Sequence, residues 1–242
     1  MQTRGLSGST LKLIAIITML IDHVGAAVIA RFIIMGNYTE LLYKVYITMR
    51  TVGRIAFPIF CFLLIEGFEH TRDRKKYALR LLGFALISEI PFDLAFSSEV
   101  LEFGYQNVFF TLFIGLVTIM AIHQVEEKTD WHPALRIALL IIIAGVGMGF
   151  AYLMKTDYDA LGVICILALY LFRKVRGQQI LAGCIAFGSF ELPALVAFIP
   201  IAFYNGKRGW NIKYFFYLFY PLHLLVLYGI CYFMGIAGIP AI

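Results

Sequence analysis

Residues 134–154 read ALRIALLIIIAGVGMGFAYLM, a run in which Arg136 is the one charged residue. At a rise of about 1.5 Å per residue, a helix of this length spans the roughly 30 Å hydrocarbon core of a bilayer. Similar apolar runs recur along the 242-residue chain, which is 61% apolar and only 14% charged. A soluble domain has about 25% charged residues. The sequence therefore predicts an integral membrane protein.

The length of the apolar runs also predicts the type of secondary structure. In lipid, only helices and closed barrels satisfy all backbone hydrogen bonds. Barrel strands have about ten residues and a period of two, whereas the runs here are longer and lack that period. We expect an all-α, polytopic transmembrane helical bundle that forms a single domain over residues 1–242. The eight expected spans are about 11–32, 45–69, 76–96, 106–123, 134–154, 158–172, 179–204 and 213–237.

Loop charges predict the orientation of this bundle. Residues 70–76 and 173–176 are strongly basic, whereas residues 97–105 carry Glu99 and Glu102 and no Lys or Arg. Because basic loops tend to stay in the cytoplasm, we expect the two basic loops and the N-terminus to be cytoplasmic. The acidic loop is then external.

One loop conflicts with eight spans. Residues 205–209 include Lys207 and Arg208, yet they would be external if 179–204 crosses the membrane once. Gly188 and Pro193 lie near the middle of that stretch and disfavour a continuous helix. The alternative is a broken helix, or two half-spans that return to the cytoplasmic side, which gives nine spans.

Several prominent features do not indicate chemistry. The net charge of +5 comes from short loops between apolar runs, so it does not favour nucleic-acid binding. The cysteines lie inside apolar stretches without a CxxC pair, as small packing residues do. No P-loop, GxSxG, HExxH or His/Cys metal spacing occurs, and no metal is predicted. The cysteines are Cys61, Cys165, Cys184 and Cys231, and the glycines expected to form a helix-packing face are Gly145, Gly147 and Gly149.

Ionisable residues inside apolar spans are the strongest functional signal in this chain. Each costs about 2.5–3.5 kcal/mol on insertion scales, so it needs a partner or a purpose. They are numerous for a protein of this size. They are Asp22, His23, Arg50, Arg54, Glu66, Glu89, Asp93 and His223.

Lys12 and His23 lie eleven residues apart in the first span. At about 100° per residue this is roughly three full turns, so both face one side, about 16 Å apart along the axis. A cation at the cytoplasmic rim can hold phosphate, and an imidazole near the bilayer middle can take a proton. The extended pantetheine arm of coenzyme A has a comparable length. The alternative is a snorkelling lysine and a histidine hydrogen-bonded within the bundle.

Asp22 points to a different side from its histidine neighbour and needs a partner on another helix. Arg50 and Arg54 lie one turn apart on the second span, and a buried arginine normally pairs with a carboxylate. We predict an ion pair between Asp22 and Arg54. We also expect Gly53 to allow close approach of another helix and Pro58 to kink the second span.

Three further carboxylates have two interpretations each. Glu66 either orients His23 or pairs with a basic residue. Pro91 is expected to end the third span near the outer face and to leave Glu89 and Asp93 at its rim. These two residues then form either an acceptor-binding edge or a capped helix end.

Motifs in family order over nearly the whole chain resemble the TraX family. The resemblance implies a bacterial inner-membrane protein. The named activity of the family is N-acetylation of the F-pilin N-terminus during conjugation, although most members are not expected to act on that pilin. The motifs are Leu11-Lys12-Leu13-Ile14-Ala15, Met19-x-Ile21-Asp22-His23-x-Gly25, Gly53-Arg54-Ile55-Ala56-Phe57-Pro58, Glu66-Gly67-Phe68, Ser88-Glu89-Ile90-Pro91-Phe92-Asp93, Asn107-x-x-Phe110-Thr111-Leu112, Tyr204-Asn205-Gly206-Lys207-Arg208-Gly209 and Phe216-Tyr217-x-Phe219-Tyr220-Pro221-x-His223.

TraX-like proteins are also similar to acyltransferase-3 type transmembrane enzymes, which carry an Arg/Lys-x10-His motif on the first helix. Lys12 and His23 have that spacing. The resemblance implies that His23 is a general base and that Lys12 and basic loop residues lie near the donor's phosphates. This sequence departs from the family pattern at two places. The arginines around Arg80 follow the acyltransferase-3 pattern only loosely, and Asp159 stands where we expect the glycine of an Asp-Tyr-Gly motif. The candidates are His23, Asp22, Arg54 and Glu66 for catalysis, Lys12, Arg72, Arg74, Lys76, Arg80, Lys207 and Arg208 for the donor, and Glu89, Asp93, Asn107 and His223 for the acceptor.

We therefore predict a membrane-embedded acyltransferase. It would move an acetyl or other acyl group from cytoplasmic acyl-CoA, with acetyl-CoA as the first candidate, to an amine or hydroxyl. Acceptors considered are a pilin-like N-terminus, a glycan, a lipid or a small molecule. His23 removes the acceptor's proton, and Arg54 is a secondary candidate for oxyanion stabilisation.

Two rival classes remain. The first is a proton-coupled transporter or channel in which Asp22, His23 and Glu66 relay protons. Transporters often show internal repeats, and this sequence has no clear one. The second is a non-catalytic assembly factor, which needs no buried constellation of histidine and carboxylates.

Overall fold

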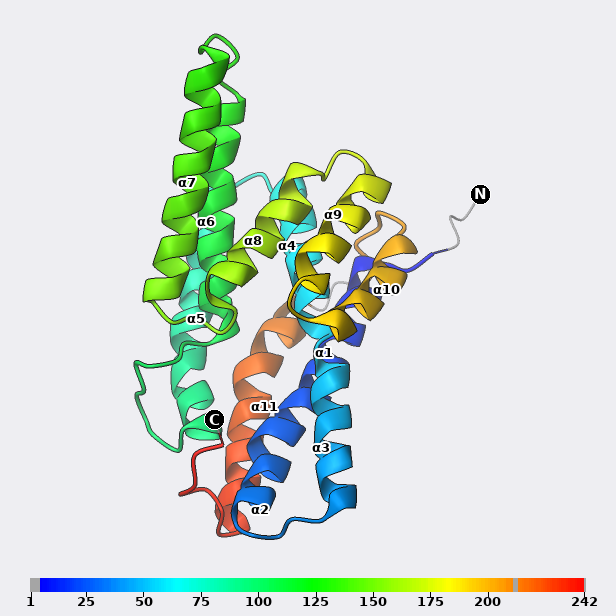
Figure 1. Cartoon of the computed structure of the whole chain (residues 1–242), viewed down its shortest axis with the longest axis vertical. Helices are drawn as coiled ribbons and strands as arrows, with labels where there is room; N and C mark the ends of the chain where they lie inside the picture. Colours follow the sequence, from blue (N-terminus) through cyan, green and yellow to red (C-terminus); the bar gives the residue numbers. More distant parts are fainter. Residues whose placement is uncertain (1–4, 211–212, 242) are drawn as a thin grey trace. The chain divides into compact units, whose positions relative to one another are not determined.

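The computed structural model describes residues 5–210 and 213–241, and it is dominated by helices (Figure 1). In these residues the β-structure consists of two isolated bridges. The all-α prediction is confirmed. In chain order the elements are α1 (Gly8–Val24), the π-helix η1 (Gly25–Ile29), α2 (Ala30–Ile34), α3 (Glu40–Gly53), α4 (Ala56–His70), α5 (Arg74–Phe96), α6 (Val108–Glu126), α7 (Pro133–Leu153), α8 (Asp159–Leu171), α9 (Arg176–Gly188), the 3₁₀-helix η2 (Leu192–Ala197), α10 (Phe198–Ala202) and α11 (Lys213–Phe233).

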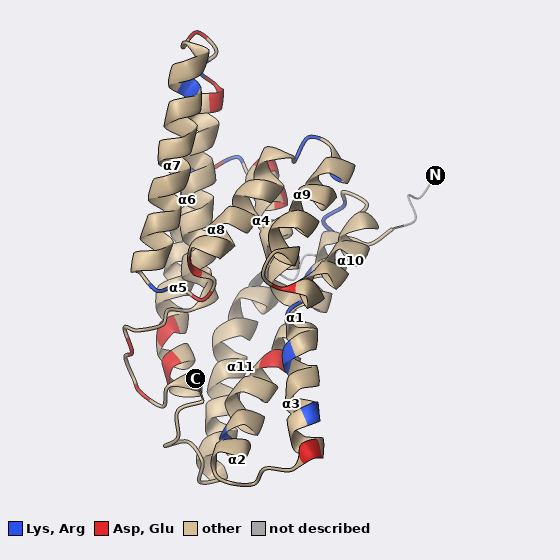
Figure 2. Ribbon diagram, in the orientation of Figure 1, with Lys and Arg blue, Asp and Glu red and all other residues tan. Residues whose placement is uncertain are grey.

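Five helical segments of the described chain are long and apolar enough to cross a membrane. Figure 2 shows that charged residues gather mostly at helix ends and in loops, and that α7 is uncharged over most of its length. This distribution is what an apolar solvent around the helices requires. The segments are Gly8–Ile34, Glu40–His70, Val108–Glu126, Pro133–Leu153 and Phe215–Phe233, at the places predicted for spans 11–32, 45–69, 106–123, 134–154 and 213–237.

Of the other three predicted spans, one is a full-length helix, one is a short helix and one is broken. The span predicted at 76–96 is one helix, α5, and the span predicted at 158–172 is the shorter α8, with 13 residues. The stretch 179–204 is not a single helix, because α9 ends at Gly188 and η2 starts only at Leu192. A proline in the first turn of η2 suits a helix start, where its missing amide costs nothing.

The basic loop 205–209 lies against the N-terminal segment. The backbone amides of Gly8 and Ser9 donate to the carbonyls of Lys207 and Arg208, at 2.8 and 3.0 Å. These carbonyls satisfy amides that the first turn of α1 leaves unpaired. The basic loop therefore lies at the start of α1, as the broken-helix alternative for 179–204 predicts.

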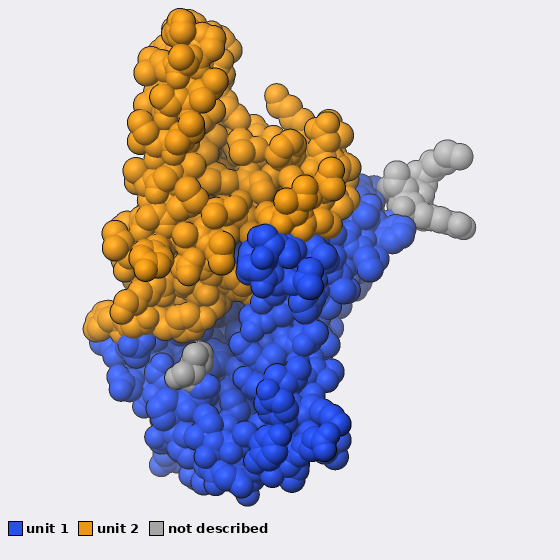
Figure 3. Space-filling view, viewed as in Figure 1, with its two compact units in different colours: residues 1–63, 87–102, 187–242 blue, residues 64–86, 103–186 orange. Residues whose placement is uncertain are grey.

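The contacts of the chain group into two compact units (Figure 3). Unit 1 comprises residues 1–63, 87–102 and 187–242, and unit 2 comprises residues 64–86 and 103–186. Both α4 and α5 contribute to each unit. The single domain predicted from the sequence stays a prediction.

In unit 1, α1 packs against α3 and α11. A Cβ atom built on Gly53 would lie 2.2 Å from Cβ of Asp22, so only glycine fits where α1 and α3 meet. The close approach predicted for Gly53 is confirmed. The break in the second span falls at Arg54 and Ile55, between α3 and α4, and not at Pro58. Pro58 instead lies in the first turn of α4, where its missing amide breaks no intrahelical bond.

In unit 2, α6, α7 and α8 pack against one another. Gly147 lies directly against Thr118, since an added Cβ would be 2.2 Å from Oγ1 of that threonine. Gly145 and Gly149 have no neighbour within 4 Å of such an atom. The predicted packing face of three glycines is therefore wrong for two of them, because successive odd positions on a helix point about 200° apart.

The Asp-Tyr-Asp sequence that opens α8 contains a residue in an unusual conformation. Asp159 has a φ of 38°, in the left-handed region that favours glycine. This is the position at which the family resemblance leads us to expect glycine. The conformation at Asp159 is thus one that glycine adopts without strain.

Candidate functional site

The histidine of the first span meets the histidine of the last helix. In unit 1, His23 Nδ1 on α1 lies 2.7 Å from His223 Nε2 on α11. The two rings stack with centroids 5.0 Å apart and planes 11° apart. The other ring nitrogen of His223, Nδ1, donates to the backbone carbonyl of Phe219 at 2.8 Å. His223 was predicted as an acceptor-binding residue, and the structure makes it the direct partner of His23.

Aromatic rings enclose this pair. Phe96 at the end of α5 and Tyr220 on α11 both present edges to the His23 ring, with centroids 5.2 and 6.1 Å away. Phe219 stacks on His223 at 4.8 Å. His23 keeps partial exposure, whereas His223 is 7% exposed. His23 is thus the more exposed member of the pair.

Lys12 lies on the same side of α1 as His23. Its Nζ is 5.4 Å from the centre of the Phe216 ring on α11, and α11 is also the helix that carries His223. Phe216 precedes His223 by two helical turns, so one stripe of α11 contacts both residues of α1. The shared face predicted from the eleven-residue spacing agrees with these contacts.

The ion pair predicted between Asp22 and Arg54 is wrong in its arginine. Asp22 Oδ2 lies 2.8 Å from Nη1 of Arg50, and Arg54 Nε lies 3.0 Å from Oε1 of Glu191. The physical reason is the break between α3 and α4. Arg50 stays within α3, beside α1, whereas Arg54 occupies the turn after Gly53, so the two side chains do not share one helical face.

We predict that Asp22 and Arg50 are energetically coupled. Arg50→Leu should lower the thermal stability of the detergent-solubilised protein, because it leaves a partly buried carboxylate without its cation. The loss should be below the about 3–5 kcal/mol typical of fully buried pairs, because Arg50 and Asp22 keep 28% and 15% exposure. Asp22→Asn added to Arg50→Leu should restore part of the stability. Asp22→Asn should give no such relief to Arg54→Leu, the matched control, and strictly additive losses in both pairs would exclude the coupling.

The carboxylates of α5 are not at a helix rim. Pro91 lies inside α5, which continues to Phe96, so the expected end of the span at this proline is wrong. Asp93 is fully buried, and its Oδ2 accepts a hydrogen bond from the backbone amide of Glu102 at 2.9 Å. Glu89 is buried as well. Asp93 therefore holds the backbone of the loop that follows α5, which fits neither a capped helix end nor an open acceptor edge.

The candidates in unit 2 have structural partners. Glu66 Oε1 lies 3.3 Å from Nη2 of Arg176, so the basic-partner alternative for Glu66 is the one observed. Asn107 is buried, caps the start of α6 and donates to the carbonyl of Ala85 at 2.9 Å. An acceptor-binding role for Asn107 therefore lacks a free surface.

The cations proposed for donor binding lie at the ends of helices or in loops. In unit 2, Arg72 and Arg80 are exposed, Arg74 stacks on the Phe68 ring at 4.3 Å, and Lys76 pairs with Asp73 at 3.3 Å. In unit 1, Lys207 and Arg208 are exposed in the loop that is hydrogen-bonded to the start of α1. Within unit 1, this loop and Lys12 thus share one end of α1.

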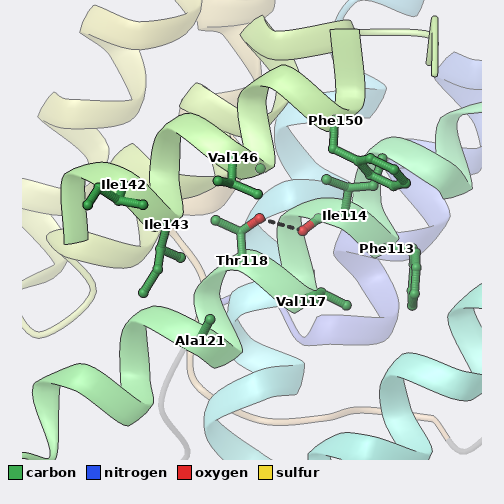
Figure 4. Close-up of a pocket in the computed structure, with 10 residues that line it drawn as sticks. Phe113, Ile114, Val117, Thr118, Ala121, Ile142, Ile143, Val146 and Phe150 are labelled. Atoms are coloured by element: carbon green, nitrogen blue, oxygen red, sulfur yellow. Dashed lines mark hydrogen bonds between the residues drawn. The ribbon is translucent and has the colours of Figure 1, made fainter. Parts of the chain in front are cut away.

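A pocket of about 320 Å³ lies between α6 and α7 (Figure 4). Its walls are apolar apart from Thr118, whose hydroxyl donates to the carbonyl of Ile114 at 2.8 Å. Val146 and Ile142 on its rim are more than half exposed. The pocket has no titratable lining residue and carries none of the predicted chemistry.

Sequence reasoning missed two polar residues. Glu191, the partner of Arg54, lies between α9 and η2 and was not singled out. Arg31 was not singled out, yet it is fully buried and donates to the carbonyls of Ala27, Ala95 and Ile239. Its position near the end of an apolar run is also one where a cation can snorkel to the interface, so the sequence gives no signal of burial.

Comparisons with known proteins complete the description of the site. A protein-family model described as TraX protein matches residues 7–231, a range that includes Lys12, His23 and His223. A relative from Dichelobacter nodosus is named a probable fimbrial assembly protein FimC, serogroup H1. It is 33% identical over 240 residues, which cover 91% of this chain and 94% of the relative. No solved structure matches the chain.

Proposed function

The chain belongs to the TraX family, and we propose that it is a membrane-embedded acyltransferase that uses acyl-CoA from the cytoplasm. Acetyl-CoA is the first donor to test. The acceptor is an amine or a hydroxyl group. In this proposal the protein resides in the inner membrane of a bacterium, with its N-terminus in the cytoplasm.

The observation that carries this proposal is the arrangement of Lys12 and His23 along α11. Lys12 marks the end of α1 that also holds the exposed cations of loop 205–209. His23 lies about 16 Å further along the axis, near the middle of the Gly8–Ile34 segment. A donor with phosphates at one end and a thioester at the end of an extended arm fits this spacing.

In the proposed reaction, the acceptor attacks the thioester carbonyl while the His23 imidazole takes the acceptor's proton. The carbon–sulfur bond breaks and coenzyme A leaves as a thiolate. The proton then passes from the imidazolium to the thiolate, which restores neutral His23. Arg54 is held by Glu191, so we assign it to structure and not to oxyanion stabilisation.

The name of the relative guides the choice of acceptor. Since that protein is named for fimbrial assembly, the N-terminal amine of a pilin-like peptide is the first acceptor to test. Glycans, lipids and small amines follow. Mass spectrometry of envelope peptides, glycans and lipids from cells with and without the gene would identify the natural product.

A proton-coupled transporter is the rival. That interpretation uses Asp22, His23 and Glu66 as a relay, but both carboxylates form ion pairs, with Arg50 and Arg176 respectively. Each carboxylate is thus engaged by an arginine, as in a structural ion pair. These pairs favour the transferase.

We predict that coenzyme A stabilises the purified protein thermally and that Lys12→Ala weakens this effect. A hydrogen bond to a charged group contributes about 1.5–3 kcal/mol. The apparent affinity for acyl-CoA should therefore fall by about 10- to 100-fold, with a smaller loss of turnover at saturating donor. The assay is a thermal shift series with coenzyme A, combined with transfer of radiolabelled acetyl groups to the peptide.

Lys44→Ala is the matched control for Lys12→Ala. Lys44 lies in the same unit, is exposed and pairs with Glu40 one turn away on α3. It should leave donor affinity unchanged. Equal affinities for the two variants, or no stabilisation of the wild type by coenzyme A, would count against a donor site at Lys12.

A further inference from the structure

The hydrogen bonds of His223 determine where its proton resides. His223 Nδ1 lies 2.8 Å from the carbonyl oxygen of Phe219. A carbonyl oxygen only accepts hydrogen bonds, so Nδ1 carries the proton. In the neutral ring, Nε2 of His223 is then an acceptor.

The same reasoning extends to His23. Its Nδ1 lies 2.7 Å from Nε2 of His223. Because that nitrogen accepts, His23 Nδ1 must donate, and the Nε2 atom of neutral His23 is left with a free lone pair. The opposite direction would require a doubly protonated His223, which is a charge enclosed by aromatic rings in a membrane-spanning helix.

Packing holds both rings in this relation. His223 is buried, with Phe219 stacked on one side and the Tyr220 ring edge at 5.5 Å. Phe96 and Tyr220 limit rotation of the His23 ring. The chain of bonds runs from Phe219 through His223 to His23 and ends on a nitrogen that can accept a proton.

We propose that His223 is a positioning residue for acyl transfer, which fixes the tautomer of His23 so that its bare Nε2 faces the acceptor. The inference rests on the proposed function of His23 as general base. During the reaction the acceptor's proton binds His23 Nε2, and the Nδ1 proton stays in the bond to His223. That bond becomes charge-assisted and stabilises the imidazolium as it forms.

The first test reads the tautomer directly and needs no substrate. The ring nitrogens of ¹⁵N-histidine-labelled protein are observed by NMR, and the five histidines of the chain are assigned by single substitutions. The wild type should show His23 protonated at Nδ1 and bare at Nε2. His223→Leu should give a mixture of the two tautomers. A wild-type His23 that is protonated at Nε2 would overturn the proposal.

The second test measures transfer of acetyl groups. His223→Leu should lower kcat by at least about 10-fold and by as much as the about 10⁴-fold that a wrong tautomer costs a serine protease, with the KM for acyl-CoA unchanged. His223→Gln places an amide oxygen near the former Nε2 position, where it can accept from His23, and should recover much of the loss. Leu222→Ala, at an exposed position next to His223 on α11, is the matched control and should have near-normal kcat.

The outcomes separate this proposal from the proposed function. A His223→Leu protein with wild-type thermal stability and wild-type kcat would overturn the positioning role and leave His23 as the base. If His223→Leu does not fold, the positioning role is tested by the tautomer in the wild-type spectrum and by the kcat of His223→Gln. The expected wild-type spectrum without any acyl transfer would refute the acyltransferase function and support the tautomer assignment.

Discussion

Replacement of His23 by Ala or Asn is expected to lower acyl transfer by about 10²–10⁴-fold, the contribution that general-base catalysis typically makes. Neither variant has a group at the Nε2 position that can take a proton. His23→Asn keeps an amide N–H close to the former Nδ1, so the hydrogen bond to His223 survives. Both variants should bind coenzyme A normally. The measurement is single-turnover transfer together with thermal shifts with coenzyme A.

The two variants also distinguish a catalytic from a structural histidine. If His23 only holds α1 against α11, His23→Asn should restore activity together with stability, because it retains the donor. If His23 is the base, His23→Asn should be stable and inactive. A stably folded His23→Asn protein with near-normal turnover would remove His23 from the mechanism.

Arg31→Leu is expected to have the largest effect on stability. The guanidinium is fully buried and donates to Ala27 O at 2.7 Å, Ala95 O at 2.6 Å, Ile239 O at 2.5 Å and the Ser98 hydroxyl at 3.0 Å. It thereby joins α2, the end of α5 and the C-terminal segment within unit 1. A leucine leaves these acceptors buried without their donor, at about 1–3 kcal/mol for each that finds no water.

The total loss from Arg31→Leu approaches the whole stability of an ordinary domain, about 5–15 kcal/mol. We therefore expect little folded Arg31→Leu protein in size-exclusion chromatography and thermal unfolding in detergent. Arg31→Lys keeps a charge but not the planar set of donors, and it should be intermediate. Arg80→Leu, at an exposed position on α5, is the control and should change little. A melting temperature for Arg31→Leu equal to that of the control would show that water replaces the guanidinium.

Part of the candidate site could be predicted because helical geometry is local. The spacing of Lys12 and His23 placed them on one side of α1 without any knowledge of its neighbours. Gly53 likewise indicated a close helix contact, and the structure provides it at Asp22. Gly188 and Pro193 in the stretch 179–204 indicated a broken helix for the same reason, since each changes the backbone at its own position.

The partners of these residues were not predictable in the same way. A pattern along one helix gives the side on which a residue lies, but not the helix that packs there. Asp22 therefore had two candidate arginines, and the turn after Gly53 selected Arg50. Glu191, the partner of Arg54, follows a helix break whose direction no local rule gives.

The amino-acid sequence was sufficient for five helical segments that are long and apolar enough to cross a membrane, and for the common side of Lys12 and His23 on α1. Both follow from interactions within one segment, because a backbone in lipid must form its own hydrogen bonds. The pairing of His23 with His223 joins residues 200 positions apart, and Arg31 reaches a carbonyl 208 positions away. Such contacts exist only once α1, α5 and α11 have packed, since their energies depend on which faces meet and not on any single helix.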